Sequence, residues 1–270
     1  GIPLMPPCTW PEQSENVMHA VPVDALLSLD LKSLWAAARQ QPKSFWFACG
    51  YLFVEYVRPQ SLYPVLDVLP WPVLFLALTF IFAEQERQKR LDSGGLSTGL
   101  IIMSCVVLLS AVAASSPALS FSHWRAFFDW IIIYFVVRRA VNTEVKLFFF
   151  IGVFFLANFK MTQHGFLSWA SRGFSFATWG VTGGPGWFHN SGEFGIQLCI
   201  FVPMLLGVAI ALRQRWSPTM QLVMGAVILT GIGSAIASSS RGALVGLAGA
   251  GIWMAMRSKY FIKAAIVIAA

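Results

Sequence analysis

The sequence predicts an all-α, polytopic membrane protein with about eight or nine transmembrane helices. Hydrophobic residues make up 57% of the 270 residues and charged residues only 11%, whereas soluble domains carry about 25% charged residues. The apolar residues are gathered into segments with short polar connections between them, and lysine and arginine are concentrated in every second connection. The net charge of +7 therefore indicates a membrane topology and no nucleic-acid partner.

Residues 1–43 precede the first apolar segment, and we expect them to form a cytoplasmic tail. The first 22 residues are rich in proline and lack the apolar core of a signal peptide. Residues 24–41 place leucines among polar residues, which predicts either an interfacial amphipathic helix or a short linker helix. Residues 44–270 form the predicted transmembrane domain.

Eight apolar segments follow, and a ninth begins near Phe261. A transmembrane helix needs about 20 apolar residues, so we expect the first two segments to begin earlier or to lie tilted. In chain order the segments are Ser44–Val57, Trp71–Ala83, Leu96–Ala114, Trp124–Val137, Val145–Phe159, Glu193–Leu212, Met220–Ala237 and Ala243–Met256.

The distribution of positive charge predicts the topology. Of the 19 lysines and arginines, fourteen lie in the N-terminal flank and in alternate connections, and five lie in the others. The positive-inside rule therefore predicts a cytoplasmic N-terminus. It places Arg58, Arg125, Arg172 and Arg241 on the opposite side of the membrane.

One predicted connection, residues 161–192, is much longer than the rest and lies on the non-cytoplasmic side. Connections longer than about 12–15 residues are usually functional or disordered. This one is too aromatic for a disordered spacer, and we expect it to cover the membrane surface or a cavity between helices. Its aromatic residues are Phe166, Trp169, Phe174, Phe176, Trp179, Trp187 and Phe188.

Residues 238–242 read Ser-Ser-Ser-Arg-Gly between two long apolar segments. An arginine at the bilayer centre costs at least about 2.5–3.5 kcal/mol, so one retained near hydrocarbon often has a function. The guanidinium of Arg241 offers five donors, which suit a phosphate, and Arg172 could hold the second phosphate of a diphosphate. The alternatives are a snorkelling anchor for Arg241 and a solvated loop position for Arg172.

The start of the sixth segment carries His189, Asn190 and Glu193. Asn190 suits a helix N-cap, and Glu193 suits the first turn beside the helix dipole. In a functional interpretation these three residues and Ser240 line an outward-facing cavity. A general-base role for His189 is possible in principle, but a structural histidine among aromatic residues is the more ordinary interpretation. No cysteine or histidine spacing indicates a metal site.

These features, in this order, resemble the O-antigen ligase/polymerase superfamily. A long outer connection leads to Asn190-Ser191-Gly192-Glu193-Phe194 at a helix start, and Ser-Ser-Ser-Arg-Gly follows two segments later, before a glycine-rich helix. The run of residues 51–60, YLFVEYVRPQ, with Tyr63-Pro64 is similar to the N-terminal part of O-antigen-ligase-like proteins of exopolysaccharide loci. The resemblance covers roughly residues 44–270.

The resemblance implies a multi-pass glycosyltransferase of the bacterial inner membrane, of the GT-C-like, lipid-sugar class. Such enzymes transfer a glycan from undecaprenyl diphosphate at the periplasmic face to lipid A-core of lipopolysaccharide, a growing polysaccharide or a protein hydroxyl, without a metal or other cofactor. Arg241 would be the diphosphate-binding arginine and Arg172 its partner. The family's catalytic histidine lies in a large periplasmic loop further downstream, so we assign no catalytic residue before Ala270 and expect an N-terminal fragment that is inactive alone.

Two other functions remain open at this point. The chain could be a transporter or flippase of lipid-linked sugars, or a non-catalytic membrane subunit of a polysaccharide export system. Transporters often show internal repeats and broken helices at the midplane. No clear repeat is present, and the polar residues gather at one face, which favours the enzyme. Ligase and polymerase activities are not distinguished by these residues.

Overall fold

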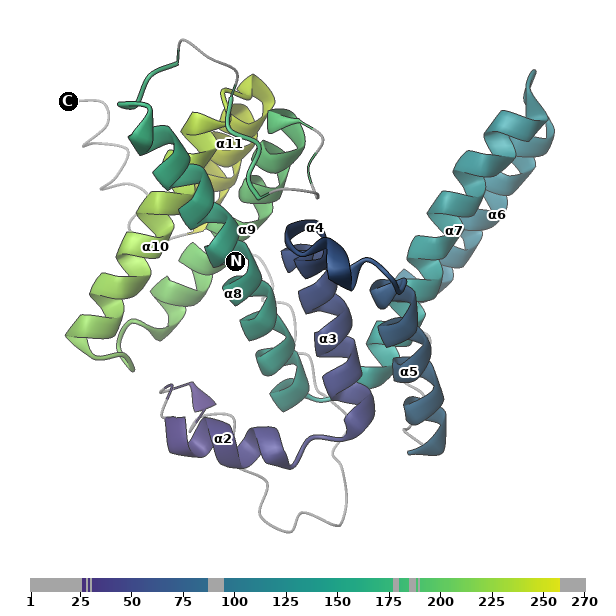
Figure 1. Ribbon diagram of the computed structural model, residues 1–270, viewed down its shortest axis with the longest axis horizontal. Coiled ribbons are helices and arrows are strands. Elements are labelled where there is room, and N and C mark those ends of the chain that lie inside the picture. Colours follow the sequence, from purple (N-terminus) through teal and green to yellow (C-terminus); the bar gives the residue numbers. More distant parts are fainter. Residues whose placement is uncertain are drawn as a thin grey trace, which may run out of the picture.

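The computed structural model describes residues 26–27, 29, 31–86, 95–176, 180–184, 188 and 190–257, and within them the regular structure is entirely helical (Figure 1). The elements are α2 (Leu31–Arg39), α3 (Lys43–Val57), α4 (Pro59–Leu62), the 3-10 turn η1 (Pro64–Leu66), α5 (Trp71–Gln85), α6 (Gly95–Val112), α7 (Pro117–Ala140), α8 (Glu144–Ser171), α9 (Ser191–Leu212), α10 (Pro218–Ala237) and α11 (Arg241–Arg257). The predicted all-α class is confirmed.

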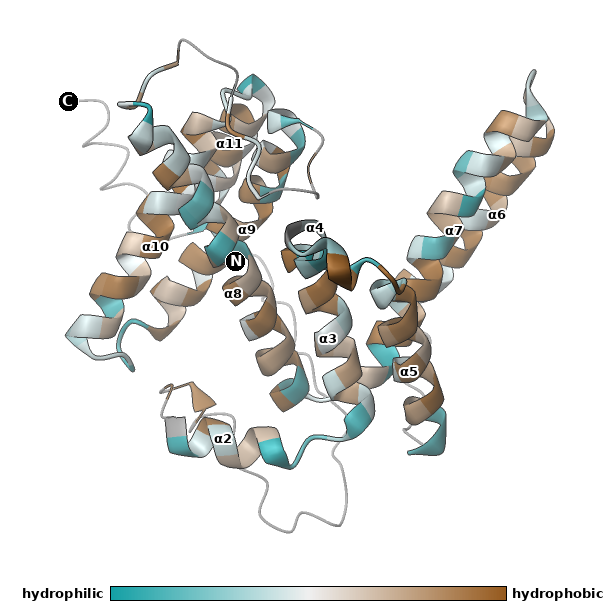
Figure 2. Cartoon of the chain, in the orientation of Figure 1, coloured by the Kyte–Doolittle hydropathy of each residue, from teal (hydrophilic) through white to brown (hydrophobic). Residues whose placement is uncertain are grey.

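Four of the described helices, α6, α8, α9 and α10, are long and apolar enough to cross a membrane, and α5 is a shorter apolar helix. Apolar residues dominate most of the helix surfaces (Figure 2). The chain is therefore a multi-pass membrane protein. Each of the eight predicted segments coincides with a helix, but the count of eight or nine spans stays a prediction. The ninth segment, near Phe261, lies outside the described residues.

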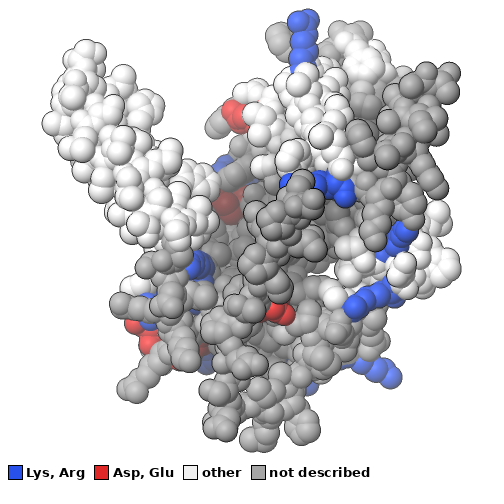
Figure 3. All heavy atoms as spheres, turned by 180° about the vertical axis from the view of Figure 1, so that it is seen from behind, with Lys and Arg blue, Asp and Glu red and all other residues white. Residues whose placement is uncertain are grey.

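The helices α8 to α11 pack into a bundle, and α3 joins this bundle to α5 through its contacts with α5 and α8 (Figure 1). The buried core of the bundle comes from α8, α9 and α10. Its fully or nearly fully buried members are Met161, Phe194, Leu198, Phe201, Val202, Leu205, Ile228 and Ala235. The α6–α7 hairpin leans away from the bundle, and its outer part shows neither blue nor red atoms on the face in Figure 3, as expected for a surface in contact with lipid.

Polar side chains and small residues hold α8, α9 and α10 together. Lipid tails are as apolar as leucine, so helices in a membrane associate through close packing and interhelical hydrogen bonds. Gln163 Nε2 donates to Thr230 Oγ1 at 2.7 Å, and Ser234 Oγ donates to the backbone oxygen of Thr162 at 2.7 Å. Gln197 Nε2 donates to Asn158 Oδ1 at 2.9 Å. These bonds fix the register of α8 against both neighbours.

The helix ends that the charge distribution assigns to one side do meet at one end of the structure. Arg139 on α7 forms an ion pair with Glu84 on α5. The last turn of α7 also contacts the first turn of α6, because Arg138 donates a hydrogen bond to Ser97. At the first turn of α3, Ser44 donates to Glu86, which follows α5. This grouping agrees with the predicted topology, whereas the side of the membrane on which it lies stays a prediction.

The predicted connection over residues 161–192 begins too early. The helix α8 continues to Ser171, so the connection to α9 covers residues 172–190, of which 177–179, 185–187 and 189 lie outside the described part. Hydropathy falls after Phe159, but the polar residues beyond it, such as Gln163, find partners on α10 and no proline interrupts the helix. With 28 residues, α8 is about 42 Å long and exceeds the roughly 30 Å hydrocarbon core.

The N-terminal region is only partly described. A helix is present within the predicted amphipathic stretch, at α2, and its Trp35 ring is exposed and lies 5.0 Å from the Arg39 guanidinium carbon. An exposed tryptophan beside a cation suits an interfacial helix, and this location stays a prediction. The tail over residues 1–25 lies outside the described residues.

The topology can be checked with single cysteines in a variant whose four native cysteines are replaced by serine. In spheroplasts, an impermeant maleimide should label Ser115→Cys, in the α6–α7 turn, without permeabilisation. It should label Gln40→Cys and Gln214→Cys only after the membrane is opened, because these turns lie at the positively charged end. The reverse labelling pattern would contradict the predicted orientation, and labelling of all three in intact spheroplasts would contradict the grouping of helix ends.

Candidate functional site

The Ser-Ser-Ser-Arg-Gly motif forms the tight turn between α10 and α11. Ser238 and Ser239 donate their backbone N–H groups to Ser234 and Ile236 at 2.9 and 3.0 Å, which closes the end of α10. Ser239 has a φ of +54°, a left-handed conformation that is uncommon for residues other than glycine. Ser240 then caps α11, because its Oγ accepts from the N–H of Ala243 at 3.3 Å. The motif is therefore a structured turn.

Arg241 is the first residue of α11 and is exposed at the end of the bundle where α8 and α10 end. Its guanidinium has no hydrogen-bond or ion-pair partner within the described part of the chain. A Cβ added to Gly242 would meet no atom within 4 Å, so the space beside this first turn is open. A helix N-terminus presents free N–H groups and a positive dipole end, which together favour an anion. The arginine adds a full positive charge at the same place.

The start of α9 lies directly against this turn. A Cβ added to Gly195 would lie 2.6 Å from Ala243 Cβ, 3.0 Å from Ser238 Oγ and 3.1 Å from Ser240 Cβ. One turn further along α9, the Cys199 thiol donates to the backbone oxygen of Ala243 at 3.0 Å. The position of Arg241 is therefore set by α9 as well as by its own helix.

The connection between α8 and α9 also contacts this turn. The N–H of Val181 donates to the backbone oxygen of Ala237 at 3.0 Å. A Cβ on Gly180 would collide with the backbone oxygen of Ser238, so only glycine allows this approach. Whether the connection covers the membrane surface or a cavity stays a prediction.

Asn190 is the N-cap of α9. Its Oδ1 accepts from the N–H of Glu193 at 2.9 Å, and its Nδ2 donates to Glu193 Oε1 at 3.1 Å. The pair forms a reciprocal cap of the helix start, as the structural interpretation of these residues predicts. Their second predicted role, lining a substrate cavity with Ser240, stays a prediction. His189 lies outside the described residues.

Arg172 caps the C-terminal end of α8 and is exposed. The last turns of α8 pack on α10, where a Cβ on Gly233 would lie 2.7 Å from Phe166 Cδ2. Arg172 therefore lies at the same end of the α8–α10 pair as the turn that carries Arg241. The packing of α9 on the turn brings the start of α9, with Asn190 and Glu193, close to Ser240 and Arg241. Arg172 lies on the neighbouring helix α8.

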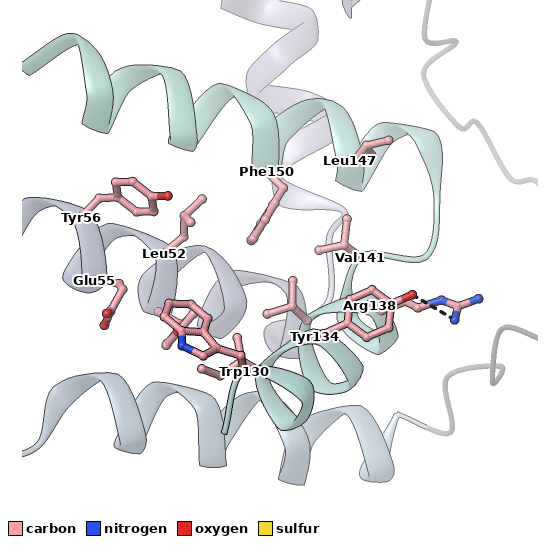
Figure 4. Close-up of a pocket in the computed structure, with 12 residues that line it drawn as sticks. Leu52, Glu55, Tyr56, Trp130, Tyr134, Arg138, Val141, Leu147 and Phe150 are labelled. Atoms are coloured by element: carbon pink, nitrogen blue, oxygen red, sulfur yellow. Dashed lines mark hydrogen bonds between the residues drawn. The ribbon is translucent and has the colours of Figure 1, made fainter. Parts of the chain in front are cut away.

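A second feature, which the sequence did not indicate, is a cavity of about 400 Å³ between α3, α7 and α8 (Figure 4). Among the described residues that line it, Glu55 on α3 and Arg138 on α7 are the charged ones. These described lining residues are Tyr51, Leu52, Glu55, Tyr56, Trp130, Ile133, Tyr134, Val137, Arg138, Val141, Leu147 and Phe150. None of these was a candidate site residue, because the cavity draws on three helices that are far apart in the chain and has no local motif.

No group of three or more His, Cys, Asp or Glu residues that could hold a metal ion is present in the described part. Comparisons with known proteins also leave the family undetermined: no protein-family model, no curated protein and no solved structure matches this chain.

The close approach at Gly195 can be tested by Gly195→Ala. The added methyl group would overlap Ala243 and crowd the Ser238–Ser240 turn, so we expect a loss of about 1–3 kcal/mol in stability. The melting temperature of the purified protein in detergent should fall by several degrees.

The matched control is Gly99→Ala on α6, where a Cβ meets no atom within 4 Å. This variant should melt at the wild-type temperature or slightly above it, because alanine favours a helix. Equal melting temperatures for the two variants would show that α9 does not pack on the turn as described.

Proposed function

We propose that the protein transfers or polymerises a glycan from undecaprenyl diphosphate to an acceptor hydroxyl at the periplasmic face of a bacterial inner membrane. This is the reaction of the O-antigen ligase-like enzymes that its motifs resemble. The observation that carries the proposal is Arg241, an exposed guanidinium at the open N-terminus of α11, held by the capped turn and by α9. A diphosphate matches this site in charge and in hydrogen-bonding capacity.

The proposed chemistry uses the site to stabilise the leaving group. When the sugar leaves the lipid diphosphate, negative charge grows on the phosphate oxygen that it leaves behind. A donor that is already oriented toward that oxygen lowers the barrier, and loss of one such donor typically reduces the rate by about 10²–10³. Arg241 and the free N–H groups of the first turn of α11 supply such donors. Arg172 is the proposed partner for the other phosphate.

The acceptor is a hydroxyl of lipid A-core, of a growing polysaccharide or of a protein, and the residue that activates it is not among those placed here. The bilayer carries the donor to the site, because the undecaprenyl chain keeps the diphosphate at the membrane surface. This matches the place of Arg241 at a helix end.

A transporter of lipid-linked sugars is the second candidate, and the cavity between α3, α7 and α8 favours it. Transporters bind their substrates near the bilayer midplane between helices. The cavity is lined mainly by apolar and aromatic side chains, which offer few partners for the hydroxyl groups of a sugar. The exposed anion site at α11 therefore makes the enzyme the better-supported proposal.

Arg241→Ala should abolish glycan transfer while expression and membrane insertion stay normal. The expected loss is at least about 10²-fold, because an oriented donor to the leaving group is removed. The measurement is glycan transfer in a complementation assay, with protein levels followed by immunoblot. Arg125→Ala is the control, since Arg125 is an exposed arginine on the same predicted side but on α7.

Arg241→Lys separates a bidentate contact from a simple charge. Lysine keeps the positive charge but lacks the planar fork that binds two phosphate oxygens together, so this variant should also fail. Near-normal transfer by Arg241→Ala would overturn the assignment. Full activity of Arg241→Lys would show that a positive charge is sufficient and that a bidentate contact is not required.

A further inference from the structure

The outer end of α8 carries an aromatic cluster formed by Phe166, Trp169, Phe174 and Phe176. Phe174 meets the Trp169 ring edge-on, with centroids 5.0 Å apart and planes at 90°. The ring centroid of Phe176 lies 5.3 Å from that of Trp169. The ring centroid of Phe166 lies 6.2 Å from that of Phe174. Trp169 is partly buried at the centre, whereas Phe174 and Phe176 are 51% and 57% exposed.

The backbone holds Phe174 in an unfavourable conformation. Its φ is +57°, directly after Gly173 at +63°. Its N–H donates to the backbone oxygen of Trp169 at 3.1 Å, which fixes this geometry at the end of α8. Glycine or asparagine would adopt the left-handed conformation at lower cost. Strained residues that persist in this way are concentrated at ligand-binding and active sites.

By helix length, the exposed rings lie near or past the end of the stretch that a hydrocarbon core would cover. From Lys146, at the charged end of α8, to Trp169 the helix rises by about 35 Å. With the average tilt of about 20° for transmembrane helices, the rise is still about 32 Å, against a hydrocarbon core of roughly 30 Å. Phe174 and Phe176 follow Trp169. Interfacial belts use tryptophan and tyrosine, which have a polar tip, and phenylalanine has none.

Trp169 adds an unused hydrogen-bond donor. Its indole Nε1 is buried and has no acceptor among the described residues, which is uncommon for a buried polar group. Phe174 and Phe176 both pack against the Trp169 indole, so a ligand oxygen would reach this donor only after a side chain near it moved. The cluster therefore combines two exposed aromatic faces with a donor beside them.

We propose that Phe174 and Phe176 form a stacking platform for a pyranose ring of a glycan. A pyranose has an apolar face of C–H groups, which packs on the electron-rich face of an aromatic ring, and a rim of hydroxyl groups, one of which would accept from Trp169 Nε1. The identity of this glycan as the donor sugar rests on the proposed function. The location supports it, because Phe166 packs on Gly233 of α10, less than two turns before the turn that leads to Arg241.

The platform can be tested by saturation-transfer NMR on the full chain in nanodiscs of phosphatidylethanolamine and phosphatidylglycerol. The probes are methyl β-glucopyranoside and N-acetylglucosamine. We expect the wild type to transfer saturation to the C–H protons of at least one probe. The double variant Phe174→Leu/Phe176→Leu keeps apolar side chains but removes both aromatic faces, and its apparent affinity should fall by about tenfold.

Two single variants and a control sharpen this test. Phe174→Gly makes the left-handed backbone favourable without the ring and should also weaken sugar contact. Phe176→Leu changes a residue outside any helix and should give a partial loss. Phe121→Leu is the control, because Phe121 is also about half exposed, at 51%, at the start of α7, and should bind the probes as the wild type does.

Unchanged sugar contact in the double variant, or no contact by the wild type with either probe, would overturn the platform. An equal loss with Phe121→Leu would identify the rings as general membrane-interface residues and would also overturn it. The proposed reaction is tested separately, since Arg241→Ala should keep sugar contact while losing transfer. If Arg241→Ala transfers normally and sugar contact still needs Phe174 and Phe176, the platform stands and the diphosphate role of Arg241 fails.

Discussion

The close contact between Gly195 and the α10–α11 turn is the constraint on which the outer end of the structure depends. Only a residue without a Cβ lets the first turns of α9 reach Ala243 and Ser238. The same contact positions the capped start of α9 and holds the turn from which Arg241 projects. Gly180 and Val181, in the connection between α8 and α9, also contact this turn. These contacts fix the position of Arg241 although its side chain is exposed. A fixed position is needed for a donor to stabilise a developing charge.

Much of the helical framework could be predicted because the bilayer leaves so few alternatives. Backbone polar groups in lipid must be satisfied within helices or closed barrels, so apolar segments translate directly into helices. A local capping signal was also informative, because Asn190 caps α9 as its position predicts. The helix ends that meet around Glu84 and Arg139 are ones that charge counting assigns to the same side, and the orientation itself stays a prediction.

The remaining features depend on contacts between distant helices, which no local pattern contains. Hydropathy ended the fifth segment at Phe159, whereas α8 runs to Ser171 because Gln163 and Thr162 are satisfied by α10. The cavity around Glu55 depends on how α7 crosses α3 and α8. The left-handed backbone of Phe174 follows a glycine, and the aromatic composition alone did not indicate a platform. The sequence thus identified Arg241 and three of its neighbours, but not the contacts that hold them together.

The most direct test of the central claim is a structure of the protein in nanodiscs with undecaprenyl diphosphate bound. The account predicts diphosphate density within hydrogen-bond distance of the Arg241 guanidinium and of the first-turn N–H groups of α11. Arg172 would lie beside the second phosphate. Density for the diphosphate elsewhere, for example between α3, α7 and α8, with Arg241 exposed to solvent, would contradict it.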